Sequence, residues 1–121
     1  MANPMAAYGD TPANASEKLA GYETIWHQSL QMLEAARQGD WERLITLEHA
    51  RATISSALME QQRGSNFTQA NQERMRELIR AILASDEEIR MLVAPRQDEL
   101  RNLVGSLNTE KKLLMAYAVN T

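Results

Sequence analysis

The feature of this sequence that most constrains its fold is a run of apolar residues at helical spacing, from about Gln69 to Leu107. Apolar side chains recur there every three or four residues, which places them on one stripe of an α-helix that must be buried. The stripe comprises Met75, Leu78, Ile79, Ile82, Leu83, Ile89, Leu92, Val93, Leu100, Leu103, Val104 and Leu107. The charged residues between them, including Arg80 and the run Asp86-Glu87-Glu88, are expected to face solvent.

The length of this run raises the question of what covers it. One uninterrupted helix would be about 55 Å long, whereas the earlier helical segments would be only about 33 Å long. Pro95 interrupts the run, because it has no N–H to donate to the carbonyl of Met91 and disfavours helical angles at Ala94. Two alternatives remain open: a break at 93–95 that ends one helix at Val93 and starts a separate extension over 96–107, or a mild kink in one helix.

The composition favours helices throughout the chain. Good helix formers such as alanine, leucine, glutamate and arginine dominate, and no stretch alternates with the period of two that strands require. The predicted fold is all-α, an antiparallel bundle of three main helices over about 17–38, 41–62 and 69–104, plus a short C-terminal helix over about 109–119. Residues 1–15 contain two prolines and small polar residues and are predicted to be a disordered leader, which leaves 16–121 as a single helical-bundle domain.

Local signals predict the connections between these helices. Gly39 suits the left-handed position that closes a helix, and Asp40 suits the N-cap of the next one. Gly105 is expected to stop the third helix, and Asn108 or Thr109 to cap the last. A final helix of about ten residues is too short to be stable alone, so it must dock, and a better ligand could replace it.

The chemistry of the chain argues against an enzyme. The net charge of −3 disfavours a duplex nucleic-acid binder, and the absence of cysteine excludes disulfides and thiolate sites. Glu23 and His27 lie four residues apart but supply too few ligands for a metal, and no phosphate-binding or catalytic motif is present. No secretory signal and no apolar run long enough to span a membrane is found. The sequence predicts a cytoplasmic, non-catalytic protein without a cofactor.

Three stretches at consistent spacing resemble one known family. They are Q-G-D-W over 38–41 with Glu48 seven residues after the tryptophan, R-Q-D-E-L-R-N-L-V-G over 96–105, and Ala116-Tyr117. They are similar to the helix 1–2 hairpin, the R-L-D-E-L-x-x-L-[IV]-G segment and the terminal Ala-Tyr of the FliT family of flagellar export chaperones. The resemblance covers roughly residues 17–118, and the chain departs from the family pattern at Pro95, Gln97 and Ala118.

The resemblance implies a binding protein of the flagellar type III export system. Such chaperones hold the C-terminal helical region of the filament-cap protein in the cytoplasm, prevent its premature assembly, and pass it to the export ATPase and its stalk-like partner. In some bacteria they also bind the flagellar master transcription regulator. Their last helix is an autoinhibitory cover over the binding groove.

These implications, combined with the apolar stripe, predict where a partner helix binds. The groove is expected on the third helix, with a second wall on the second helix, a rim charge at Arg80 and a cover from the C-terminal helix. The predicted groove residues are Leu47, Ile54, Ile79, Arg80, Leu83, Ile89, Leu92 and Val93, and the predicted autoinhibitory residues are Leu113, Leu114 and Tyr117. For Ile79 and Leu83, an ordinary core position is the alternative.

Two further hypotheses belong to other classes of protein. A helical oligomeric adaptor of another secretion system would cover the stripe with a second copy, which leaves homodimer formation open. A carboxylate-bridged metalloprotein would need more ligands than the sequence offers.

Overall fold

The computed structural model describes the backbone of residues 2–62 and 68–120, and the side chains of 18–58, 60 and 68–117. Its elements are α1 (Ala2–Gln38), α2 (Trp41–Gln62), α3 (Gln69–Val93), the short 3₁₀ helix η1 (Ala94–Arg96) and α4 (Arg101–Asn120). Every regular element in this described part is helical, which confirms the prediction of an all-α bundle.

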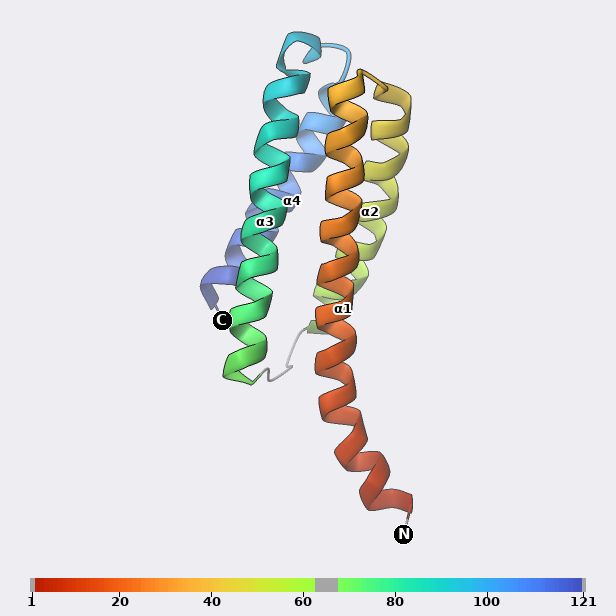
Figure 1. Cartoon of the computed structure of the whole chain (residues 1–121), viewed down its shortest axis with the longest axis vertical. Helices are drawn as coiled ribbons and strands as arrows, with labels where there is room; N and C mark the ends of the chain where they lie inside the picture. Colours follow the sequence, from red (N-terminus) through yellow and green to blue (C-terminus); the bar gives the residue numbers. More distant parts are fainter. Residues whose placement is uncertain (1, 63–67, 121) are drawn as a thin grey trace.

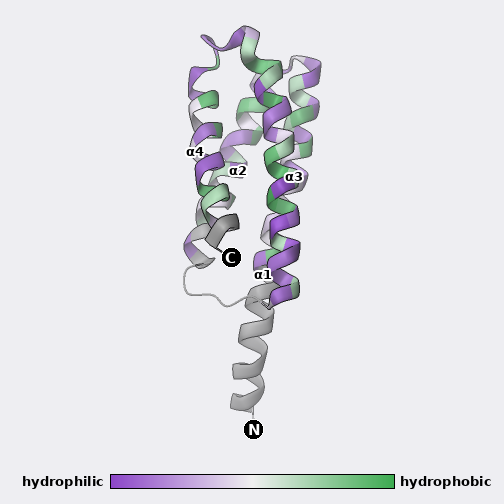
Figure 2. Ribbon diagram, turned by 90° about the vertical axis from the view of Figure 1, so that its left-hand side faces the viewer, coloured by the Kyte–Doolittle hydropathy of each residue, from purple (hydrophilic) through white to green (hydrophobic). Residues whose placement is uncertain are grey.

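The four long helices form an up-down-up-down bundle (Figure 1). Helix α1 lies beside both α2 and α3, and α4 also lies beside both of them. Helices α1 and α4 therefore occupy opposite sides of the bundle, and α4 closes the side between α2 and α3. Each described helix carries both hydrophobic and hydrophilic residues (Figure 2), as expected of helices with one buried face.

The core consists of two hydrophobic clusters stacked along the bundle. The turn-end cluster lies near the α1–α2 connection and contains Met32, Leu33, Ala35, Ala36, Leu44, Ile89, Val93, Leu100, Leu103 and Leu107. The far-end cluster contains Tyr22, Ile25, Leu58, Met75, Leu78, Ile79, Ile82 and Leu114. All four long helices contribute to both clusters, so each cluster ties the whole bundle together.

Side-chain caps are present at two helix starts, at Asp40 as predicted and at Thr68. Gly39 has φ of 70°, the left-handed conformation that glycine adopts without strain, and the Asp40 carboxylate accepts a hydrogen bond from the Arg43 backbone N–H at 3.2 Å. At the start of α3, Thr68 Oγ1 accepts a hydrogen bond from the Asn71 backbone N–H at 3.2 Å. Side chains next to the helix starts therefore fix where α2 and α3 begin.

The third helix ends where the proline predicts, so the alternative of one kinked helix over 69–104 is wrong. Helix α3 stops at Val93, and the chain then tightens into η1, with Ala94 keeping right-handed helical angles of −52° and −43°. With 25 residues, α3 is about 37 Å long, close to the about 33 Å of α2. The expected overhang of the third helix beyond its neighbours is therefore absent.

The prediction of a short C-terminal helix was also wrong. Helix α4 contains 20 residues and runs through Gly105 and Thr109 without a break. A glycine in a helix interior costs about 1 kcal/mol relative to alanine. Leu103 and Leu107 are buried on either side of Gly105, and their burial outweighs this cost.

The N-terminal segment differs from its prediction as well. Helix α1 begins at Ala2, so residues 2–15 continue the helix instead of forming a disordered leader. Alanine occurs often in this stretch and favours a helix, against the unfavourable effect of Pro12 in the helix interior. Pro4 lies in the first turn, where backbone N–H groups have no intrahelical partner and a proline is tolerated.

Candidate functional site

The predicted groove residues lie in the same two clusters as the inward face of α4. Ile79 is fully buried in the far-end cluster, and Ile54 and Leu83 pack against that cluster while remaining partly exposed. Ile89 and Val93 are fully buried in the turn-end cluster, with the partly exposed side chains of Leu47 and Leu92 packed against it. Arg80 is exposed on α3. In this closed arrangement the three fully buried residues are core positions, because α4 completes the clusters that contain them.

The three predicted cover residues do not share one face of α4. Leu114 is fully buried in the far-end cluster, and Tyr117 packs against the same cluster while partly exposed. Leu113 is 42% exposed and belongs to neither hydrophobic cluster, so it contributes less to the docking of α4 than Leu114 does. The residues that hold the first half of α4 are instead Leu103 and Leu107, both in the turn-end cluster.

A buried polar layer separates the two clusters, and the guanidinium of Arg51 lies at its centre. Arg51 comes from α2 and is completely buried. Its NH1 donates to Ser29 Oγ of α1 at 2.8 Å and to Asp86 Oδ1 of α3 at 2.6 Å. Its NH2 donates to Asp86 Oδ2 at 3.0 Å and to Glu110 Oε2 of α4 at 2.7 Å. One side chain therefore joins all four long helices.

This layer corrects two expectations from the sequence. Asp86 was expected on the solvated face, but it is 2% exposed and paired with Arg51. The neighbouring Glu87 and Glu88 do lie on the exposed face, where they pair with Arg90 and Arg37. Position 86 points inward because it falls four residues after Ile82 and three before Ile89, on the buried stripe of α3.

The layer pairs one basic side chain with two acidic ones. Burial by itself lowers the pKa of Arg51, but its hydrogen bonds to Asp86 and the charges of Asp86 and Glu110 outweigh burial, and the pKa is raised. Burial raises the pKa of Asp86, and the hydrogen bonds from Arg51 offset part of that effect. Since Arg51 stays protonated, two buried carboxylates share one cation.

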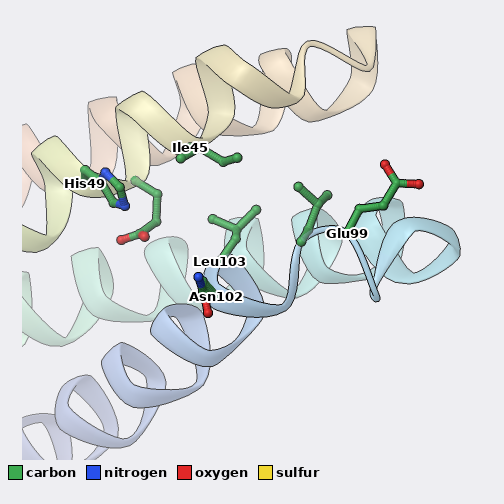
Figure 3. A pocket seen from close by; sticks show the side chains of 7 residues that line it. Ile45, His49, Glu99, Asn102 and Leu103 are labelled. Carbon is green, nitrogen blue, oxygen red and sulfur yellow. The ribbon is translucent and has the colours of Figure 1, made fainter.

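A third buried carboxylate, that of Glu48, lies beside this layer at the edge of a small pocket. Glu48 is 2% exposed, and its Oε2 accepts a hydrogen bond from Ser106 Oγ of α4 at 2.9 Å. Burial raises the pKa of Glu48, the bond from Ser106 lowers it in part, and the charge of Glu110 raises it further. The pocket has a volume of about 160 Å³ and lies between α2 and the start of α4 (Figure 3), lined by Ile45, Glu48, His49, Glu99, Leu100, Asn102 and Leu103.

Sequence reasoning missed the polar layer, although its spacing was visible. Arg51 stands seven residues from both Leu44 and Leu58, which are buried on α2. Glu110 stands between Leu107 and Leu114 at spacings of three and four. A charge of each sign on otherwise apolar stripes is the signal of a buried ion pair.

No group of three or more histidine, aspartate or glutamate side chains that could hold a metal ion is found among the described residues. Within the same part of the chain, no helix is long and apolar enough to cross a membrane. The arrangement provides instead an apolar surface on α2 and α3 that a helix covers, with one buried arginine in the middle.

Comparisons of the sequence with known proteins identify one family. The family model described as "Flagellar protein FliT" matches residues 19–119. A flagellar protein FliT of Escherichia coli strain 55989 is 29% identical over 104 residues, which is 86% of each chain. The FliT protein of Escherichia coli strain K12 is 28% identical over 96 residues, or 79% of each chain. No solved structure matches. Because the family model matches most of the chain, including α2 and α3 in full, this chain belongs to the FliT family of flagellar proteins.

Proposed function

We propose that this protein is a flagellar export chaperone that holds the C-terminal helical region of the filament-cap protein on the surface of α2 and α3 now covered by α4. In this role it prevents premature assembly of the cap protein in the cytoplasm and passes it to the export ATPase and its stalk-like partner. The same surface is the proposed contact for the flagellar master transcription regulator in bacteria where that interaction exists. Membership of the FliT family supports a flagellar role.

The observation that carries the proposal is the position of α4 in the bundle. Helix α4 fills the side between α2 and α3, and α1 holds those two helices together from the opposite side. If α4 left, the contacts of α1 with α2 and α3 would remain, and a helix-binding surface would be exposed. An amphipathic partner helix could then dock there in place of α4.

The connection before α4 supports such an exchange. Residues 94–100 form only the 3₁₀ turn η1 and hydrogen-bonded turns, such as that from the Leu100 N–H to the Arg96 carbonyl at 3.0 Å. A short irregular segment of this kind can change its backbone angles while both flanking helices stay intact. Competition between α4 and a partner helix is then decided by the difference in their contact free energies.

Removal of the cover tests the proposal. Deleting residues 106–121 should raise the affinity for a peptide of the cap protein's C-terminal segment by about tenfold or more, which corresponds to about 1.4 kcal/mol. Isothermal titration calorimetry would measure the change. Unchanged or weaker binding by a truncated chain that remains helical would contradict the proposal.

A pair of point variants provides a matched control in the full chain. Leu114 is fully buried on the inward face of α4, whereas the adjacent Leu113 is 42% exposed. Leu114→Ala should raise the affinity for the same peptide, because it weakens the docking of α4. Leu113→Ala should leave the affinity within about twofold. Equal effects of the two variants would argue against displacement of α4.

A further inference from the structure

The buried arginine at the centre of the covered surface restricts which helices can bind there. We propose that a helix that replaces α4 must carry one acidic residue on its apolar face, placed to accept a hydrogen bond from Arg51 as Glu110 does. This inference rests on the proposed function and adds the chemistry of the partner. The surface would thereby select acidic-centred amphipathic helices over entirely apolar ones.

Arg51 is held in place without α4. Its NH1 is bound to Ser29 and Asp86, and one N–H of NH2 is bound to Asp86. Ser29 belongs to α1 and Asp86 to α3. Helix α1 contacts both α2 and α3, so these partners stay beside Arg51 when α4 leaves. The guanidinium therefore keeps its position when α4 leaves, with its charge compensated by Asp86.

The remaining N–H group of NH2 depends on α4 for its acceptor. In the closed state it donates to Glu110 Oε2 at 2.7 Å. Without α4 this N–H is free to bind water. An incoming helix that covers it with apolar side chains would bury a cationic donor without an acceptor, which is much less favourable than pairing it. A carboxylate is the strongest acceptor that a partner side chain can offer.

The spacing of the inward residues of α4 fixes where the acidic residue of a replacing helix must lie. The inward residues of α4 are Leu103, Leu107, Glu110 and Leu114, all 5% exposed or less. A replacing helix in the same register would place its acidic residue three residues after one apolar side chain and four residues before another. A lysine or arginine at that position would meet Arg51 with like charge, which rejects other amphipathic helices.

The fit of α4 on this layer is imperfect, which makes its replacement easier. Glu110 Oε1 and Arg51 Nε are buried without a hydrogen-bond partner among the described residues. Each such atom lowers the net stabilisation that the layer provides. A partner carboxylate that accepts hydrogen bonds from both NH2 and Nε would bind Arg51 better than Glu110 does.

The test is an acid-to-amide scan of the partner. Peptides of the cap protein's C-terminal segment, each with one Asp or Glu replaced by its amide, are titrated into the full chain. One replacement should lower the affinity by about tenfold or more, and the others by less than about twofold. Less than twofold loss at every position, while the parent peptide binds, would overturn the inference and leave the proposed function intact. Failure of the parent peptide to bind would overturn both.

A variant with an apolar layer tests whether Arg51 causes the loss of affinity in the peptide scan. Arg51→Met/Asp86→Leu/Glu110→Leu removes the charges together, a change that packed cores commonly tolerate. Circular dichroism first verifies that the variant is folded. The acid-to-amide replacement that lowers the affinity of the peptide for the wild-type chain should not lower its affinity for this variant. A tenfold loss that persists in this variant would contradict a role for Arg51, and if the variant does not fold, the peptide scan decides alone.

Discussion

The two hydrophobic clusters differ in how firmly they hold α4. In the turn-end cluster, the chain from Leu100 to Leu107 contributes three buried leucines beside Ile89 and Val93. In the far-end cluster, α4 contributes one fully buried residue, Leu114, with Tyr117 packed at its edge. The polar layer lies between them. The difference predicts that detachment of α4 begins at its C-terminal end, with the Glu110–Arg51 contact as the boundary between the weakly and the firmly held parts.

The largest effect is expected at that boundary. Arg51→Met leaves Asp86 and Glu110 buried without their cation and should lower the free energy of unfolding by about 3–5 kcal/mol, measured by urea denaturation. The matched control is Arg74→Met, since Arg74 pairs with Glu23 at 3.9 Å on the exposed surface. The control should change stability by less than about 0.5 kcal/mol. A loss of under about 1 kcal/mol for Arg51→Met would mean that the layer does not join the helices.

The next largest loss of stability is expected from leucine variants of α4, one in each cluster. Leu107→Ala and Leu114→Ala each remove a fully buried leucine side chain of α4. Leu107→Ala should lower the free energy of unfolding by about 2–5 kcal/mol. Leu114→Ala should lower it by less, because the end of α4 can detach locally and so limits the loss. Equal losses in denaturation would contradict an opening that starts at the C-terminal end.

A smaller effect is expected at Gly105. An alanine Cβ there would meet no atom within 4 Å, so Gly105→Ala should stabilise α4 by up to about 1 kcal/mol. A firmer cover should weaken binding of the cap-protein peptide by up to about fivefold in calorimetry. Gly39→Ala is the control, since its φ of 70° strains an alanine and should destabilise the bundle. Tighter peptide binding by Gly105→Ala would argue against α4 as a cover of the peptide-binding surface.

The smallest effect concerns pH. Because burial raises the pKa of Glu48 from its ordinary 4.5, the native state binds a proton there more tightly than the unfolded chain. The contribution of Glu48 to stability is therefore present at low pH and is lost as the pH rises above 4.5. Glu48→Gln keeps an acceptor for Ser106 and removes the titration. Its melting temperature relative to wild type should rise between pH 4 and pH 7, and a constant or falling difference would contradict this.

Local features of the fold were predictable from the sequence because their causes are local. The left-handed Gly39, the caps at Asp40 and Thr68, and the end of α3 before Pro95 each depend on a few neighbouring residues. The apolar stripes likewise identified most of the buried residues of α3. These signals fix where helices start, stop and face.

The remaining features depend on contacts between distant segments. Gly105 carries a local preference to end a helix, but the burial of α4 against α2 and α3 overrides it. The inward direction of Asp86 makes sense only with Arg51, which is 35 residues away and on another helix. The spacing of Arg51 and Glu110 on apolar stripes marks two buried charges, but no local pattern shows which residues they pair with, so the central part of the candidate site was missed.

The most direct test of the displaced cover is amide hydrogen exchange of the full chain with and without the cap-protein peptide. In the free chain, amides of α4 after Ser106 should exchange faster than those of α3. Peptide binding should remove protection from α4 and increase protection in α3. Protection of α4 that stays unchanged at saturating peptide would contradict the account.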